Sequence, residues 1–302
     1  MKTGSEDNLE NYLSQRRALV EEALERLIPG EENAPSLLFR AMRYSLFAGG
    51  KRLRPILCLA GAEAAGGDPA SVLPAACALE CIHTYSLIHD DLPAMDDDDL
   101  RRGKPTCHKV FGEATAILAG DALLTQAFTL LADPRHMPSL PPLTRVKVIA
   151  EIGKAAGPFG MVGGQVMDMA PPEGRGEVSF LDAMHRRKTG AMIRVSVVAG
   201  AMLCGGDPMT IKALSSYGER IGLAFQIADD ILDVTGDPGE LGKGTGGDRR
   251  LGKVTYPAVM GLEASRRRMA DLVDGALTDL EGLDERAHPL RGIAKFIMER
   301  KS

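Results

Sequence analysis

The chain has 302 residues, of which 44% are hydrophobic and 25% are charged, ordinary values for one large globular domain or two smaller ones. Its net charge of −5 argues against nucleic acid as the main partner, because such proteins carry a basic surface, and the absence of tryptophan argues against base-stacking platforms. Five scattered cysteines without a CxxC pair favour reduced cytosolic thiols over a disulfide framework.

The predicted elements are helices with apolar residues at a spacing of three and four. They span residues 9–28, 71–91, 114–133, 181–203 and 209–234, and the region from about 257 to 300 predicts two or three more. Loops are expected at 28–35, 65–71, 132–143, 171–178 and 236–253. No alternating strand pattern and no βαβ rhythm is present. We therefore expect a single all-α domain over residues 1–302, with about ten or more helices.

The N-terminal stretch MKTGSEDNLENYL is polar and has no apolar signal core. The most apolar later stretch, AMIRVSVVAGAMLCGG, is interrupted by Arg194 and broken by glycines, so it is too short and too polar to span a bilayer. We expect a soluble, cytoplasmic protein without stable membrane insertion.

An acidic cluster ends the predicted helix at 71–91, in the stretch HDDLPAMDDDDLRRGK. Pro93 disfavours helix at the residue before it, so Asp90 and Asp91 fall in the last turn. The helix macrodipole is negative at that end and opposes carboxylates there. Asp96 returns on the following loop, whereas Asp97 and its two successors are expected to be solvated or held by neighbouring bases.

A second cluster, Asp229-Asp230-Ile-Leu-Asp233, lies in an apolar segment near the end of the helix at 209–234. Residues three and four apart share a helix face, so the three carboxylates repel one another. Two such clusters at helix ends predict bound cations. Because all candidate ligands are oxygens, a hard ion is favoured, and Mg²⁺ commonly joins one or two carboxylates to substrate phosphates.

Basic residues stand beside these clusters and predict an anion site separate from the metal site. They occur in GGKRLRP (49–55), at Arg101 and Arg102, in RRK (186–188), and at Lys243 and Lys253. No GxSxG or Ser/His/Asp spacing suggests a covalent intermediate. The pattern therefore favours metal-assisted departure of a diphosphate, with one phosphate-bearing substrate held through metal and a second by Arg and Lys.

The ordered motifs GGKRLRP, HDDLPAMDDDDLRRGKPTCH, GDAL, HRRKTG, FQIADDILDVTGD and LGK…GKVTYP resemble those of the trans-type isoprenyl diphosphate synthases, most closely the bacterial farnesyl diphosphate synthases. The resemblance covers roughly residues 40–300. It implies a helical bundle around a central cavity, a homodimer, and head-to-tail condensation of an allylic diphosphate with isopentenyl diphosphate through an allylic carbocation. The departed diphosphate would accept the proton.

The resemblance also assigns roles by position. About three Mg²⁺ ions would be held directly by Asp90, Asp96 and Asp229, and Asp91, Asp230 and Asp233 would bind them or orient their water. Isopentenyl diphosphate would be held by Lys51, Arg54, His83 and Arg102. The allylic diphosphate would be held by Arg101, Lys188, Gln226, Lys243 and Lys253, with Thr189 beside the reacting carbons. The 236–253 loop and the tail residues Arg300 and Lys301 would close over the site.

Product length is predicted from the helix that ends at Asp90. Tyr85 lies five residues upstream, ~7.5 Å along the axis, and Ser86 lies one turn upstream. An isoprene unit is about 5 Å long, so an aromatic ring at Tyr85 would form a floor after two or three units. In family members of this type an aromatic residue there accompanies a C15 product. We predict farnesyl diphosphate, made from dimethylallyl and geranyl diphosphates.

Other functions remain open at this point. A geranylgeranyl or geranyl diphosphate synthase would differ only in the floor. A terpene cyclase would normally lack the second diphosphate site, for which Lys51, Arg54 and Arg102 are present. A non-catalytic partner subunit would tend to lose one acidic motif, and both are intact.

Overall fold

The computed structural model describes residues 4–169, 177–235 and 254–299, and within them the chain is almost entirely helical. Its first half contains α1 (Gly4–Leu27), α2 (Ser36–Leu46), α3 (Leu53–Ala64), the 3-10 turn η1 (Pro69–Val72), α4 (Leu73–Asp90), the strands β1 (Leu100–Arg101) and β2 (Lys104–Pro105), α5 (Cys107–Phe111) and α6 (Glu113–Ala132). Its second half contains α7 (Pro142–Ala156), α8 (Met161–Met169), α9 (Val178–His185), the π turn η2 (Arg186–Gly190), α10 (Ala191–Leu203), α11 (Pro208–Thr235), α14 (Tyr256–Met260), α15 (Leu262–Asp279), the 3-10 turn η3 (Glu285–Ala287) and α16 (His288–Glu299).

The predicted all-α class is confirmed, and so are most of the predicted helices. The helix expected at 71–91 begins as the 3-10 turn η1 and continues as α4, with Pro74 in its first turn. The segment expected at 181–203 is one continuous helical run from Val178 to Leu203, widened at 186–190 into a π turn. The loops expected at 171–178 and 236–253 fall largely outside the described residues.

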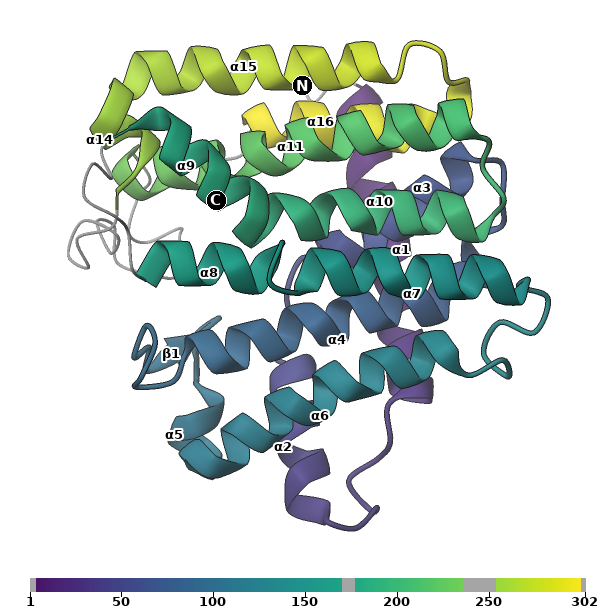
Figure 1. The fold of residues 1–302 in the computed structure, drawn as a ribbon, viewed down its shortest axis with the longest axis vertical. Coiled ribbons are helices and arrows are strands. Elements are labelled where there is room, and N and C mark those ends of the chain that lie inside the picture. Colours follow the sequence, from purple (N-terminus) through teal and green to yellow (C-terminus); the bar gives the residue numbers. More distant parts are fainter. Residues whose placement is uncertain (1–3, 170–176, 236–253, 300–302) are drawn as a thin grey trace.

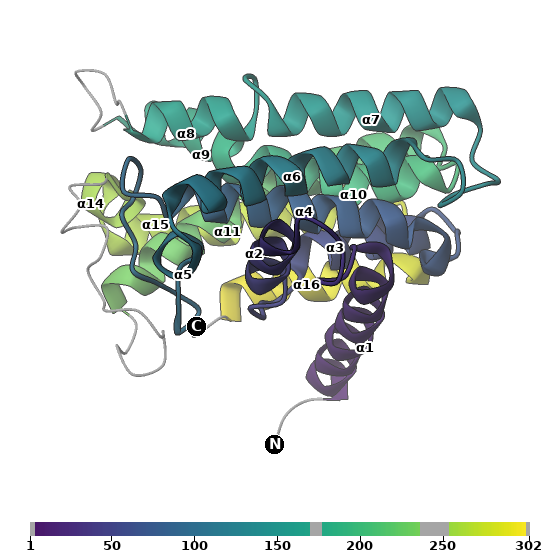
Figure 2. The same cartoon turned by 90° about the horizontal axis from the view of Figure 1, so that it is seen from below.

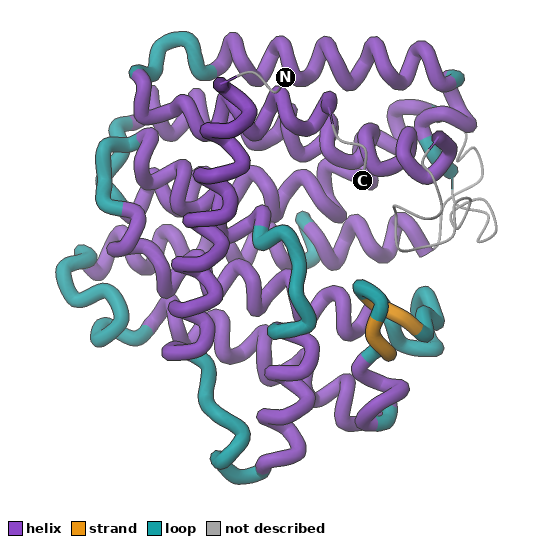
Figure 3. The backbone as a smooth tube through the Cα atoms, turned by 180° about the vertical axis from the view of Figure 1, so that it is seen from behind, coloured by secondary structure: helices purple, strands orange, loops and turns teal. Residues whose placement is uncertain are grey.

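Most helices run side by side across the view in Figure 1, while α1 crosses behind them, as Figure 3 shows from the back. Helices α7 and α8 form an outer layer, with α6 beside them and α4 behind α6 (Figure 2). Helix α4 is buried along most of its length, including 13 of its 18 residues, because its sequence is apolar on every side. It can therefore serve as a central support for a site at its end.

Glycines at the contact between α3 and α10 allow the two helix backbones to lie close together. A Cβ atom built on Gly200 would lie 1.9 Å from the carbonyl oxygen of Cys58, and one on Gly61 would lie 2.1 Å from that of Val197. Any larger residue would force these helix backbones apart. Gly61 and Gly200 thus allow the backbones of α3 and α10 to pack closely against each other.

Helices α4 and α11 end at the same end of the bundle, on the left of Figure 1, where the β1–β2 hairpin and α14 also lie. The chain direction of both helices brings the two acidic motifs to this end. The fold therefore places both predicted metal motifs in one region, although they are separated by more than a hundred residues.

Two of the described helical segments are long and apolar enough to span a membrane, namely residues 69–90, which include α4, and α6. In the first segment 72% of the apolar window is buried inside the protein, as for the core helix of a globular domain. In α6 only 39% is buried, so part of its apolar surface faces outward.

Candidate active site

The first acidic motif is shaped by the end of α4. Asp90 and Asp91 were expected in the last turn; the helix ends at Asp90, and Asp91 is its C-cap residue. The chain then turns back, because the amide of Asp96 donates to the carbonyl oxygen of Asp90 at 2.9 Å and that of Asp97 donates to Leu92 at 3.2 Å. This turn holds Asp96 against Asp90, whereas Asp97 is exposed with a left-handed φ of 52°.

Asp90 sits where a carboxylate is electrostatically unfavourable. Burial raises the pKa of Asp90 to about 6, and the neighbouring Asp96 and Asp91 act in the same direction. Lys188 and Arg101 oppose this rise. Lys188, which belongs to the turn η2, is thus close enough to act on the end of α4.

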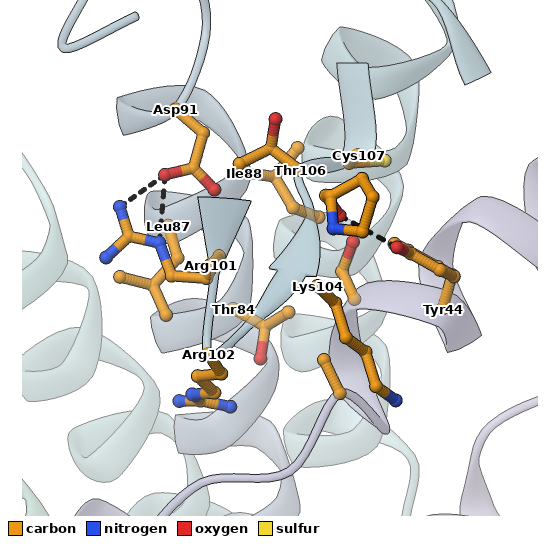
Figure 4. A pocket seen from close by; sticks show the side chains of 13 residues that line it. Tyr44, Thr84, Leu87, Ile88, Asp91, Arg101, Arg102, Lys104, Thr106 and Cys107 are labelled. Atoms are coloured by element: carbon orange, nitrogen blue, oxygen red, sulfur yellow. Dashed lines mark hydrogen bonds and ion pairs between the residues drawn. The ribbon is translucent and has the colours of Figure 1, made fainter. Parts of the chain in front are cut away.

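Asp91 and the two arginines that follow the acidic run lie around the hairpin (Figure 4). Asp91 Oδ1 accepts hydrogen bonds from Arg101, at 2.9 Å from Nε and more closely from Nη2. Arg102 points the opposite way, and its Nη1 donates to the carbonyl oxygen of Gly49. The two adjacent arginines therefore contact two different parts of the protein, Asp91 and the loop at Gly49.

The remaining aspartates of the run are held on the surface by bases. Asp98 accepts from Arg101 at 3.2 Å, and Asp99 pairs with Lys109 at 2.7 Å. Asp98 and Asp99 are thus held by neighbouring bases, as expected, while the metal roles of Asp90, Asp91 and Asp96 stay predictions.

The second acidic motif divides along α11. Asp230 is 2% exposed, and its carboxylate accepts from Gln226 Nε2 at 3.2 Å and from the amide of Tyr256 at 3.0 Å. Asp229 and Asp233 are half-buried. We expected the three carboxylates to share one helix face. Asp230 instead turns toward the amide of Tyr256 in α14, because adjacent helical positions point about 100° apart.

Gln226 connects this motif to the turn η2. Its Oε1 accepts from Thr189 Oγ1 at 3.1 Å while its amide donates to Asp230. The structure thus joins Thr189, Gln226 and Asp230 in one hydrogen-bonded row. Next to this row, Lys188 Nζ donates to Asp168 Oδ2 of α8 at 2.6 Å.

Three basic residues, Arg54, His83 and Arg102, lie near the start of α3, close to Asp229 of the second motif. Burial lowers the pKa of the Arg54 guanidinium, whereas Glu80 and Asp229 raise it. Burial, followed by the charges of Arg54 and Arg102, holds the pKa of His83 well below its ordinary value, so the imidazole is neutral. Arg54, His83 and Arg102 are therefore close together, and their role as one diphosphate site stays a prediction. Lys51 is exposed beside them.

The donor set fits a divalent cation that is completed by substrate. No group of three or more His, Cys, Asp or Glu side chains in the described ranges converges closely enough to hold a metal alone. Mg²⁺ typically takes one or two carboxylates and completes its shell with water and phosphate oxygens, so two carboxylates such as Asp90 and Asp96 suffice. The unfavourable burial of charge at Asp90 is what such a cation would relieve.

Two predicted substrate ligands, Lys243 and Lys253, and the tail residues Arg300 and Lys301 lie outside the described residues. The two chain-length residues are described. Tyr85 is 7% exposed, and its ring meets that of His89 edge-on at 5.6 Å. The hydroxyl of Ser86 donates to the carbonyl oxygen of His83 at 2.8 Å, within its own helix.

Sequence reasoning missed several polar residues around the site. Asp168 pairs with Lys188, and both side-chain polar atoms of Gln165, one turn earlier on α8, are buried without a hydrogen-bond partner among the described residues. Gly164 lets α8 approach η2, since a Cβ there would lie 2.2 Å from the amide of Lys188. The signal was available in GMVGGQVMDM, where two polar residues interrupt a small and apolar run.

His185, the residue before η2, is expected to make the free energy of unfolding depend on pH. Its ring is 6% exposed and stacks on Tyr256 at 5.6 Å, and both ring nitrogens lack hydrogen-bond partners in the described chain. Burial lowers its pKa to about 4, and Lys188 acts in the same direction, whereas Asp168 and Asp182 act to raise it.

Between pH 4 and 6.5 the unfolded chain binds a proton at this histidine that the folded protein does not, so stability falls as pH decreases through this window. The contribution lost between pH 8 and pH 5 is about 2 kcal/mol. Urea unfolding at both pH values should show this loss in the wild type and a smaller loss in His185→Gln. Equal pH slopes for the two proteins would contradict the assignment.

The chain is similar to known proteins over nearly its whole length. The family model described as polyprenyl synthetase matches residues 35–285. The farnesyl diphosphate synthase of Geobacillus stearothermophilus is 48% identical over 296 residues, covering 97% of this chain and 98% of that protein. The geranylgeranyl diphosphate synthase of Cyanophora paradoxa is 46% identical over 297 residues, covering 98% and 97%.

Solved structures agree. An FPP/GFPP synthase from Zymomonas mobilis has a TM-score of 0.85 at 36% identity, covering 97% of this chain and 99% of that one. The geranylgeranyl pyrophosphate synthetase of Pyrococcus horikoshii has a TM-score of 0.87 at 34% identity, with the same coverage. The fold is therefore shared with these proteins over nearly the full length of the chain.

Proposed function

The chain belongs to the polyprenyl synthetase family and is a prenyltransferase, and from this premise we propose that it is a farnesyl diphosphate synthase. It would condense isopentenyl diphosphate first with dimethylallyl diphosphate and then with geranyl diphosphate. The proposed reaction type rests on one observation. The acidic ends of α4 and α11 lie at the same end of the bundle, near a separate basic group around Arg54. One substrate can then be held through metal and the other by side-chain cations.

The C15 product rests on Tyr85. Farnesyl and geranylgeranyl synthases are similar to this chain at nearly equal identity, so overall likeness does not select a product. Tyr85 is buried on α4, five residues before Asp90, and packs its ring against His89. A prenyl tail that extends along α4 from the diphosphate site would meet this aromatic pair after about two or three isoprene units.

We propose that Asp90, Asp96 and Asp229 hold Mg²⁺, about three ions in all, with Asp91, Asp230 and Asp233 in supporting positions. When bound, the metal would neutralise charge on the allylic diphosphate and stabilise it as a leaving group. Lys188 would contribute a further positive charge at that diphosphate. Asp230, whose oxygens accept from Gln226 and from the Tyr256 amide, would fix the orientation of α11.

The other side chains would act on the carbon skeletons. The allylic C–O bond breaks, the diphosphate leaves with the electron pair, and the isopentenyl double bond attacks the resulting cation. The oxygen atoms of Thr189 and Gln226, linked at 3.1 Å, would present dipoles to this cation. The new cation would then lose a proton to the departed diphosphate. Arg54, Arg102 and neutral His83 would hold the isopentenyl diphosphate still during these steps.

The function is tested by incubating the protein with Mg²⁺, labelled isopentenyl diphosphate and either dimethylallyl or geranyl diphosphate. We expect a C15 product from both allylic substrates, identified by chromatography after dephosphorylation. A main C20 or C10 product would favour geranylgeranyl or geranyl diphosphate synthase instead. Absence of incorporation by folded protein would support a non-catalytic partner subunit, and cyclic hydrocarbons from an allylic diphosphate alone would indicate a terpene cyclase.

We also propose that the chain forms one domain and acts as a homodimer in the cytoplasm. Large apolar side chains are exposed on the outer layer formed by α6, α7 and α8 and include Leu118 (59%), Val146 (61%), Phe159 (85%) and Val166 (61%). A second copy of the chain would cover this face, which also explains why α6 is apolar but only partly buried. Light scattering should give a mass about twice the 32.2 kDa of the chain, and a monomeric mass would contradict the proposal.

A further inference from the structure

Arg52 lies in the middle of the GGKRLRP motif, but its side chain is completely buried and turned into the protein. It precedes α3 with a left-handed φ of 51°, an unusual conformation for a residue other than glycine. Gly49 and Gly50 also have positive φ values, of 94° and 128°. Glycine adopts such φ values readily, so the unfavourable conformation in the loop between α2 and α3 is that of Arg52, and other contacts must hold it.

The Arg52 guanidinium supplies such contacts to three helices. Its Nε donates to Glu21 Oε1 of α1 at 2.9 Å, and its Nη1 donates to Glu80 Oε1 of α4 at 2.6 Å. Its Nη2 donates to the carbonyl oxygen of Leu46, the last residue of α2, at 2.7 Å. One planar side chain thereby connects α1, α2 and α4 to the start of α3.

The residues expected to hold isopentenyl diphosphate lie around Arg52 and the loop that it fixes. Lys51 and Arg54 stand on either side of Arg52 in the chain. The Arg102 guanidinium rests on the same loop, because it donates to the carbonyl oxygen of Gly49 and a Cβ on Gly50 would lie 2.5 Å from its central carbon. The loop that Arg52 fixes is therefore the platform for the basic site.

Besides the hydrogen bonds through which Arg52 fixes the loop, the negative charge of Glu80 acts on the basic residues around it. Its side chain is 1% exposed, and its Oε2 has no hydrogen-bond partner in the described part of the chain. Its negative charge acts on Arg52, Arg54 and Arg102 together. His83 follows it by one helical turn on α4. Glu80 is thus a shared counter-charge that allows three guanidinium groups to lie near one another.

We propose that Arg52, bound between Glu21 and Glu80, is a positioning residue for the isopentenyl diphosphate site. This inference rests on the proposed function, because it assumes that Lys51, Arg54 and Arg102 bind this substrate. It adds that their geometry is set by a buried arginine that does not touch the substrate. A lysine at this position retains the charge but presents all its donors from one nitrogen atom, so it cannot reproduce the planar spread of bonds to Glu21, Glu80 and Leu46.

The test compares Arg52→Lys with Arg145→Lys. Arg145 is also a buried arginine, and it donates to the carbonyl oxygens of Leu131 at 2.8 Å and Met137 at 2.6 Å in the α6–α7 connection, away from the site. We expect Arg52→Lys to raise the KM for isopentenyl diphosphate at least tenfold and to change the KM for geranyl diphosphate less than twofold. Arg145→Lys should lower the melting temperature, but it should not change the KM for isopentenyl diphosphate relative to the KM for geranyl diphosphate.

Direct binding gives a second measurement that does not depend on turnover. Calorimetry with isopentenyl diphosphate in the presence of a metal chelator should show binding to the wild type and at least tenfold weaker binding to Arg52→Lys. If that variant does not fold, Glu21→Gln removes one half of the arginine's support at a partly exposed position and should raise the same KM at least threefold. Unchanged values in a folded variant, or a parallel rise for both substrates, would overturn the inference. A wild type that neither binds nor incorporates the substrate would instead overturn the proposed function.

Discussion

Replacing Asp90 or Asp229 by asparagine is expected to lower kcat/KM with geranyl diphosphate at least about 100-fold, which corresponds to about 2.7 kcal/mol of transition-state stabilisation. Each aspartate would hold cationic charge on the departing diphosphate, and asparagine retains the volume but not the negative charge. Asp90 is held by the turn that brings Asp96 back against the end of α4. Burial lowers the pKa of Arg54, and Asp229 lies close enough for its charge to oppose that lowering.

A matched control for these variants is Asp97→Asn. Asp97 belongs to the same acidic run but is exposed, with a left-handed φ of 52° that asparagine also tolerates. Its replacement should leave kcat/KM within about twofold of the wild type. Steady-state rates over a range of Mg²⁺ concentrations provide the measurement. If Asp90→Asn retained more than a tenth of the activity, the assignment of the first metal motif would be wrong.

Shortening Tyr85 to alanine should move the main product from C15 to C20 or longer. The aromatic ring is 7% exposed and packs edge-on against His89, so its removal opens space along α4 beyond the proposed floor. The same change should lower stability by about 3 kcal/mol, because a large buried aromatic side chain is lost. Product chromatography and urea unfolding measure the two effects separately.

The control for the floor is Tyr85→Phe, which retains the ring and removes only the hydroxyl group. It should still give C15 as the main product, because ring volume rather than hydrogen bonding blocks the tail. If Tyr85→Ala also gave only C15, the floor would lie elsewhere on the cavity wall. If Tyr85→Phe lengthened the product, the blocking role would belong to the hydroxyl.

The amino-acid sequence by itself determined the helices with strong apolar periodicity and the places where they end. Pro93 after Asp91 indicated the end of α4, and the structure ends that helix at Asp90. The pairing of acidic runs with apolar helices indicated cation sites, because carboxylates repel one another unless something neutralises them. The shorter elements α2, α3, α7 and α8 were not predicted individually. Pro and Gly interrupt the patterns of α3, α7 and α8, whereas α2 contains neither and is only 11 residues long.

Only the tertiary structure decided which charges face the site and which support the fold. In the sequence Arg52 and Arg54 look equivalent, yet Arg52 is buried between Glu21 and Glu80 while Arg54 lies with His83 and Arg102. Asp229 and Asp230 are likewise adjacent, yet Asp230 turns to the amide of Tyr256. The physical reason is that a side chain's role depends on partners far away in the chain. Local spacing fixes the helix face on which a residue lies, and packing alone fixes what that face meets.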